Sequence, residues 1–147
     1  MKLSTRVRYG LRALVELADV QKESPVLLDS VAQKQGISRK YLDAIFARLK
    51  TAGIVTSSRG AGGGFMLTRT PQQINLLQVY EGLEGKMSLV DCDVQDRHCG
   101  RQENCSTTEV WHEVSRLMAD YMLSVDLAML VKEKREKERK NSEMYYI

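Results

Sequence analysis

The sequence predicts a mainly α-helical protein with a small β-hairpin, namely a winged helix-turn-helix followed by a long C-terminal dimerisation helix. Three observations support this fold class. Apolar residues recur at helical spacing in three segments, and two short β-prone runs enclose a glycine-rich tip. The chain has 147 residues, of which 43% are hydrophobic and 28% charged, which is ordinary for one globular domain with an appendage.

Two helices are expected before residue 36. The first begins near Ser4 or Thr5, either of which can serve as its N-cap, and it ends before Pro25. Its apolar stripe recurs every three to four residues from Val7 to Ala18. A short second helix over residues 29–35 stops at Gly36, because glycine readily adopts the left-handed conformation that ends many helices.

A third helix is expected over residues 38–52, with Ser38 as its N-cap and Gly53 at its end. Two helices joined by a short turn that contains glycine are typical of a helix-turn-helix, although a solvated helical hairpin would show the same pattern. The third helix buries Leu42, Ile45, Phe46 and Leu49 and turns the polar residues Arg39, Lys40, Tyr41 and Asp43 outward.

A β-hairpin is expected directly after this helix, with strands over residues 54–58 and 64–68. Its glycine-rich tip is not a phosphate-binding loop, because strand leads to strand and no Lys-Ser/Thr pair follows. A hairpin in this place is instead a wing. Its small residues Gly60 and Gly62 would let the tip enter a minor groove, with Arg59 as the cation attracted there.

The charges are unevenly distributed. Residues 1–70 carry a net charge of +7, residues 71–131 carry −6, and residues 132–140 add +3. A basic first half joined to an acidic second half indicates that the first half binds a polyanion, and we expect double-stranded DNA.

Four segments are predicted. Residues 1–84 form the DNA-binding domain, including a short helix over residues 76–83, and residues 85–105 form an irregular loop that carries the cysteines. A capping box of Ser106 and Glu109 opens a dimerisation helix over residues 106–131, about 40 Å long at ~1.5 Å per residue. This helix is too long for the winged domain to cover, so we expect a symmetric homodimer. The charged residues 132–147 are expected to fray.

Three cysteines, Cys92, Cys99 and Cys105, fall within one short stretch of the chain. A cysteine cluster in a chain without a signal peptide favours metal binding or redox chemistry over a structural disulfide. The polar loop offers no core in which these thiols could be buried, so we expect them to bind a metal or a cluster. Zinc, a thiol redox switch and loop thiols without a function are the alternatives.

Other classes of protein are disfavoured. The chain has no signal peptide and no apolar run long enough to span a membrane, so we expect a cytoplasmic protein that does not bind membranes. It has no nucleophile elbow, paired-carboxylate arrangement or phosphate loop, so we do not expect an enzyme. A protein-interaction module built on the helical arm would leave the basic first half unexplained.

Four stretches of the sequence match a known family: the N-terminal segment Ser4-Thr5-Arg6-Val7-Arg8-Tyr9-Gly10-Leu11-Arg12-Ala13-Leu14, the turn Gln35-Gly36-Ile37-Ser38, the pair Tyr41-Leu42 and the wing Arg59-Gly60-Ala61-Gly62-Gly63-Gly64-Phe65. Together they resemble the Rrf2 family of bacterial winged-helix regulators. The resemblance runs from residue 1 to about residue 130. It implies a homodimeric transcription regulator, most often a repressor, that contacts DNA through Ser38 to Tyr41 with their neighbours and through Arg59.

The cysteine triplet resembles that of the cluster-binding branch, with IscR-like and NsrR-like members, which implies an iron–sulfur cluster, with [2Fe-2S] favoured over [4Fe-4S]. The fourth ligand departs from the family pattern. Thr108 stands where IscR-like members have histidine, and Arg8 stands where NsrR-like members have an acidic residue. His98, Glu109 or a group from the partner chain are the candidates that remain. The alternative is a thiol-redox or metal-responsive repressor without a cluster.

Overall fold

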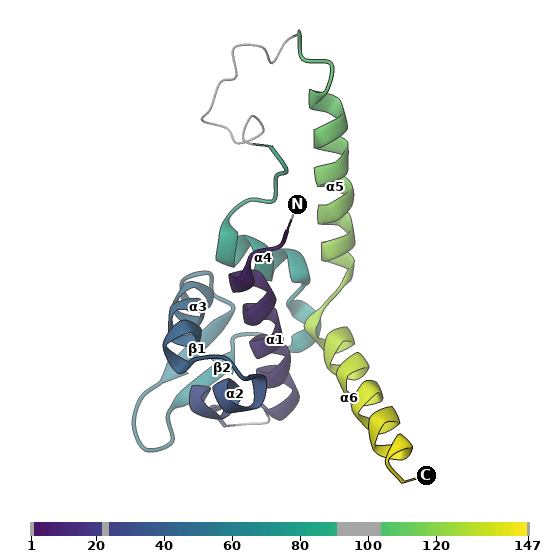
Figure 1. Cartoon of the computed structure of the whole chain (residues 1–147). Coiled ribbons are helices and arrows are strands. Elements are labelled where there is room, and N and C mark those ends of the chain that lie inside the picture. Colours follow the sequence, from purple (N-terminus) through teal and green to yellow (C-terminus); the bar gives the residue numbers. More distant parts are fainter. Residues whose placement is uncertain (1, 22–23, 91–103, 147) are drawn as a thin grey trace.

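The computed structural model describes residues 2–21, 24–90 and 104–146. In these residues the chain forms six α-helices, one short 3-10 helix and a two-stranded antiparallel hairpin (Figure 1). The elements are α1 (Thr5–Val20), α2 (Leu28–Gln35), α3 (Arg39–Thr51), β1 (Val55–Ser58), β2 (Gly64–Leu67), η1 (Pro71–Gln73), α4 (Leu76–Glu84), α5 (Thr108–Ser124) and α6 (Leu127–Met144). The predicted fold class, mainly α-helical with a β-hairpin wing, is confirmed.

Helices α1 to α4 enclose the hydrophobic core of the winged domain. The stripe expected on α3 is buried, and the Phe46 ring at its centre is fully enclosed. The first helix begins as expected, since the Ser4 side chain accepts a hydrogen bond from the backbone N–H of Val7 at 3.1 Å. A Cβ added at Gly10 would lie 2.7 Å from a methyl carbon of Leu83, so this glycine lets α1 and α4 pack closely.

The wing is anchored to the domain at its base. Val55 pairs with Leu67 and Ser58 with Gly64, so the hairpin register matches the expected strands. Val26, in the link between α1 and α2, exchanges two backbone hydrogen bonds with Phe65, of 2.9 and 2.8 Å. The Phe65 ring then meets the Phe46 ring edge to face, with 4.9 Å between centroids. The base of the wing is therefore held against the core.

The C-terminal helical segment is divided, where a single helix over residues 106–131 was expected. Helix α5 ends at Ser124 because the next residues form backbone hydrogen bonds with the start of α4: the N–H of Leu76 donates to Val125 and that of Leu127 to Ile74. The extended backbone at Asp126 then places its side chain to cap α6, accepting from the N–H of Met129 at 2.8 Å.

Two further expectations about this segment are corrected. The capping box of Ser106 and Glu109 is absent: Thr107 is the N-cap of α5 and makes no side-chain capping bond. The charged tail does not fray after residue 131, since α6 continues to Met144. Its first half is held by ion pairs between Lys134 and Arg135 and the acidic side chains of α1.

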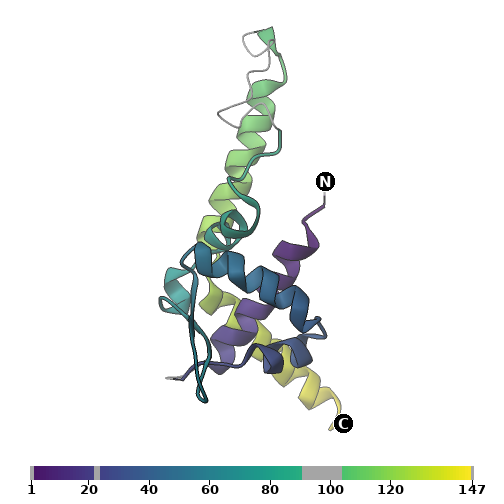
Figure 2. The same ribbon diagram turned by 90° about the vertical axis from the view of Figure 1, so that its left-hand side faces the viewer.

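The N-terminal end of α5 and the winged domain lie far apart. Figures 1 and 2 share a vertical axis, and in both views α5 rises away from the domain while the wing and the end of α6 point the opposite way. Residue 105, directly before α5, therefore lies at the end of the molecule remote from the wing. No described helix is long and apolar enough to cross a membrane.

Candidate DNA-binding face and cysteine loop

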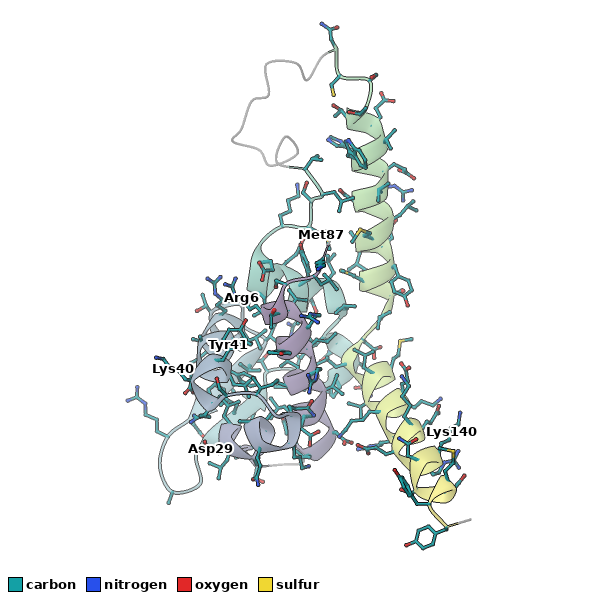
Figure 3. The ribbon with its side chains drawn as sticks, in the orientation of Figure 1. Arg6, Asp29, Lys40, Tyr41, Met87 and Lys140 are labelled. Carbon is teal, nitrogen blue, oxygen red and sulfur yellow. The ribbon has the colours of Figure 1, made fainter. Side chains whose placement is uncertain are left out.

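The N-terminus of α3 is exposed and built as predicted. The hydroxyl of Ser38 accepts a hydrogen bond from the backbone N–H of Tyr41 at 3.2 Å, which satisfies one of the free donors of the first turn. Lys40 is exposed, and in Figure 3 its side chain points away from the helices. This end of α3 therefore offers a cation and free backbone N–H groups, both of which attract phosphate.

Arg39 is held by two carboxylates. Its guanidinium lies 3.0 Å from Asp43 one turn later in α3 and 3.5 Å from Asp29 at the start of α2. All three side chains are exposed, so these pairs are weak and can exchange for contacts with DNA.

Tyr41 connects α3 to α1. Its ring meets the Tyr9 ring edge to face with 6.0 Å between centroids, and the Arg12 guanidinium lies 5.5 Å from the centroid of Tyr9. Arg12 also donates to the backbone carbonyl of Gln35 at 2.7 Å and to its side-chain oxygen at 3.1 Å. The start of α3 is therefore supported by the first helix through aromatic and cationic contacts.

The wing tip exposes Arg59 on a tight turn. Gly60 has a φ of 102°, which residues with side chains rarely adopt, and its carbonyl accepts from the N–H of Gly63 at 2.9 Å. Gly62 is exposed with open space around it. Gly63 was not singled out from the sequence, although a Cβ there would lie 2.6 Å from the Ser58 carbonyl. The run of three glycines in the sequence is the signal that could have identified Gly63.

Lys50 is a residue that the sequence reasoning missed. It lies in the last turn of α3, and its Nζ donates to the hydroxyl of Ser57 in β1 at 2.6 Å. Nothing in the local sequence pairs these two residues, because the contact depends on how the hairpin turns back along the helix.

Of the three cysteines, only Cys105 lies within the described residues; Cys92, Cys99 and the candidate ligand His98 lie outside them. Cys105 is partly exposed and precedes α5, with its Sγ 3.4 Å from the hydroxyl of Thr107. Hydrogen bonds from the hydroxyl of Thr107, then from that of Thr108, lower the pKa of the Cys105 thiol to about 7. A substantial fraction is therefore thiolate near neutral pH, the form that binds metals.

The other positions discussed for the fourth ligand are spread out. Glu109 is exposed in the first turn of α5, next to Thr108, whereas Arg8 is exposed on α1. Within residues 2–21, 24–90 and 104–146, no three histidine, cysteine or acidic side chains gather as a metal site would require.

The chain entering the cysteine loop is fixed to α5. The backbone N–H of Leu89 donates to the buried hydroxyl of Ser115 at 3.1 Å, and the Ser88 hydroxyl bonds the backbone of Val90. Leu89 is thus hydrogen-bonded to α5, and Cys105 precedes the same helix by three residues, so both described flanks of the cysteine loop are connected to α5.

Comparison with known proteins identifies the family. The family model Rrf2, described as an iron-dependent transcriptional regulator, matches residues 3–133. The chain belongs to the Rrf2 family.

Individual Rrf2 proteins are similar over most of the chain. Protein rrf2 of Nitratidesulfovibrio vulgaris is 38% identical over 90% of this chain and 89% of its own length. The regulator IscR of Xenorhabdus nematophila is 32% identical over 90% and 80%. The solved structure of T. potens IscR matches with a TM-score of 0.75 and 34% identity over 93% and 90% of the two chains. That of CymR, the global cysteine regulator of B. subtilis, gives 0.73 and 32% over 90% and 98%.

Membership of the Rrf2 family confirms the resemblance seen in the sequence and shows that the protein is a DNA-binding transcriptional regulator and not an enzyme. The described face agrees with this role, because both α3 and the wing present exposed cations. The relatives include proteins named IscR and CymR, so the family alone does not choose between a cluster and a cysteine-responsive regulator.

Proposed function

We propose that the protein is a homodimeric repressor whose affinity for its operator is switched by an iron–sulfur cluster bound to Cys92, Cys99 and Cys105. The observation that carries the proposal is the position of Cys105, a partly exposed thiol three residues before the start of α5, in a chain with two more cysteines shortly before it. Three thiolates in so short a segment suit an iron–sulfur cluster.

The surroundings of Cys105 suit a cluster ligand. Thr107 and Thr108 donate hydrogen bonds to the Cys105 thiol, and hydrogen bonds to ligand sulfurs are among the features that tune iron–sulfur potentials. We favour [2Fe-2S] over [4Fe-4S], with a fourth ligand from His98, Glu109 or the partner chain. A bound cluster would supply a group that oxidation, nitrosylation or iron loss can change.

The rest of the chain would carry such a change to DNA. Both flanks of the loop are attached to α5, and the end of α5 is hydrogen-bonded to the start of α4 through Val125 and Leu76. Helix α4 in turn packs on α1 and α3 of the winged domain. A change at the cluster would therefore bias how the winged domain sits relative to α5, which is what a two-state switch requires.

The dimer is proposed from the exposed apolar side chains of α5. Val110, Leu117 and Tyr121 are 55, 54 and 69% exposed, and a hydrophobic helix face of this kind needs cover. A second copy of α5 offers the same apolar face, so a symmetric pair would cover both. Two copies of α3 would then enter successive major grooves about 34 Å apart, and the operator should be a partial palindrome.

We place this activity in the cytoplasm, with the bacterial chromosome.

A thiol-redox repressor without a cluster is the second candidate. The partly exposed Cys105 thiol favours it, as does similarity to CymR, the global cysteine regulator of B. subtilis. Oxidation of Cys105 would change the contacts of the chain just before α5, the same place at which a cluster would act.

Anaerobic purification separates the two candidates. The cluster proposal expects iron, acid-labile sulfide and absorbance at about 300–500 nm. Serine at any one of the three cysteines should abolish these signals, whereas Ser106→Ala, next to Cys105, should leave them intact as a control. A colourless, iron-free parent whose operator affinity still responds to a disulfide-forming oxidant would support the thiol switch instead. The operator for these assays is a duplex selected from random-sequence DNA by the parent protein.

A further inference from the structure

Glu16 of α1 is a charged side chain that is almost fully buried, with 2% of its surface exposed. Its carboxylate accepts from Lys34 at 2.7 Å and Gln35 at 3.2 Å, both in α2, and from Lys134 of α6 at 2.9 Å. Burying an unpaired carboxylate is costly, so these donors fix the position of Glu16 and Glu16 fixes theirs. One buried carboxylate therefore connects three helices.

Helix α6 is held at the same place by a second carboxylate. Lys134 lies 2.5 Å from Asp19 of α1, and Arg135 lies 2.6 Å from the other oxygen of Asp19. The match to the Rrf2 family ends at residue 133, so both cations lie just beyond it. These ion pairs attach the middle of α6 to the winged domain.

The acceptor Glu16 is also connected to the recognition helix. Its neighbour Gln35 is the last residue of α2, directly before the left-handed turn at Gly36 that leads into α3. Gln35 is bonded by Arg12 as well, and Arg12 reaches Tyr41 of α3 through the Tyr9 ring. A continuous set of contacts therefore runs from α6 to the first turn of α3.

We propose that Glu16 and Lys134 are positioning residues for DNA binding: they form a clamp through which α6 sets the position of the helix-turn-helix turn and of the first turn of α3. The clamp rests on the DNA-binding role of the family and not on the cluster. Its failure would leave the cysteine proposal standing, and variants of the clamp should keep the iron content of the parent.

The clamp differs in its expected effects from a direct phosphate contact by Lys134. The Lys134 side chain is 22% exposed and already paired with Glu16 and Asp19. A positioning residue should affect sequence-specific binding without changing its salt dependence. A cation that contacts phosphate should affect all DNA, and its removal should lower the slope of log affinity against log salt by about 1.

The test compares the full-length parent with Lys134→Met, which keeps the length of the side chain and removes its charge, and with Lys134→Arg, which keeps the charge. Lys137→Met is the matched control, because Lys137 pairs with Glu133 within α6. Operator affinity, affinity for unrelated duplex and the salt slope are measured for each variant. Native-state amide exchange is followed at Gly36 and Ile37 in the turn and at Leu49 in the core of α3.

The clamp predicts that Lys134→Met weakens operator binding roughly fivefold to tenfold, with the salt slope and the binding of unrelated DNA unchanged. Lys134→Arg should restore the affinity, and Lys137→Met should not alter it. The amides of Gly36 and Ile37 should exchange faster in Lys134→Met while that of Leu49 does not.

Three outcomes would overturn the clamp. They are unchanged operator affinity in Lys134→Met, a salt slope lower by about 1, or equal acceleration of exchange at all three amides, which indicates general destabilisation.

Discussion

The Nζ of Lys50 in the last turn of α3 lies 2.6 Å from the hydroxyl of Ser57 in the wing. The recognition helix and the wing are thus joined by the turn at Gly53, by the contact of the Phe46 and Phe65 rings and by this hydrogen bond. We therefore expect the two to contact DNA as one unit, so that the position of the wing on its groove depends on the position of α3.

Ser57→Ala tests this coupling without removing a cation. An exposed hydrogen bond contributes about 0.5–1.5 kcal/mol at most, so the free energy of unfolding should change little. The wing should lose one of the contacts that fix its direction, and discrimination should fall at the base pairs that flank the α3 contacts. Affinities for a series of base-substituted operators measure this, with Ser58→Ala on the same strand as the control. Equal discrimination in Ser57→Ala and the parent would contradict the coupling.

Arg59→Ala tests the wing tip. We expect weaker operator binding, a salt slope lower by about 1, and a changed preference at A·T-rich flanking positions, where a narrow minor groove attracts arginine. Arg69→Ala, an exposed arginine just beyond β2, is the control. If Arg59→Ala bound every sequence as well as the parent at ~150 mM salt, the wing would have no role in recognition.

Leu117→Asp tests the dimer. The side chain is 54% exposed in a single chain, and a partner helix would bury it, so the aspartate would place an unpaired charge in the interface at a cost of roughly 3–5 kcal/mol. Light scattering should then report monomers. Leu27→Asp, at a similarly exposed leucine of the winged domain, should remain dimeric. A stable Leu117→Asp dimer would exclude α5 from the interface.

Acid should weaken the attachment of α6. Burial alone raises the pKa of Asp19, but hydrogen bonds from Lys134 and Arg135 outweigh it and hold the pKa below its ordinary value. The pKa of Glu16 is lowered in the same way, since hydrogen bonds from Lys34 and Lys134 outweigh its burial. A carboxyl whose pKa is lower in the folded state stabilises the fold above its unfolded pKa, and this stability is lost as the pH falls through the folded value.

Urea unfolding at a series of pH values measures whether the free energy of unfolding falls with pH in this direction. The parent should lose stability below about pH 4, where carboxyls with ordinary pKa values protonate. Asp19→Asn should be less stable than the parent at neutral pH and should lose less on acidification. The same loss in both proteins would show that Asp19 does not contribute to the acid dependence.

Local signals in the sequence predicted the winged domain well. Ser38 and Gly36 specify the start of α3 and the end of α2 because a side-chain acceptor and a left-handed glycine act within a few residues. The wing was predicted for the same reason, since its strands and glycine tip are contiguous in the chain.

Contacts between distant segments were not predictable in this way. The break between α5 and α6 arises because Val125 and Asp126 pair with the segment around Asn75, far earlier in the chain, although Val125 fits the helical periodicity. The ion pairs of Lys134 with Glu16 and Asp19 likewise join opposite ends of the sequence. A run of alternating charges alone indicates a solvated helix end, and only the packing of α6 on α1 gives it partners.

The residues of the cysteine site could be predicted from the sequence, but their positions in the fold only in part. Three cysteines in one short loop indicate a site, and the structure adds the junction of Cys105 with α5.

The most direct test of the switch is the operator affinity of the parent and of the Cys92→Ser, Cys99→Ser, Cys105→Ser triple variant, each purified without oxygen and measured before and after mild oxidation. The account predicts that oxidation changes the affinity of the parent by at least about fivefold, the lower end of typical allosteric couplings, and leaves the triple variant unchanged. The same affinity before and after oxidation in both proteins, with equal iron content, would contradict it.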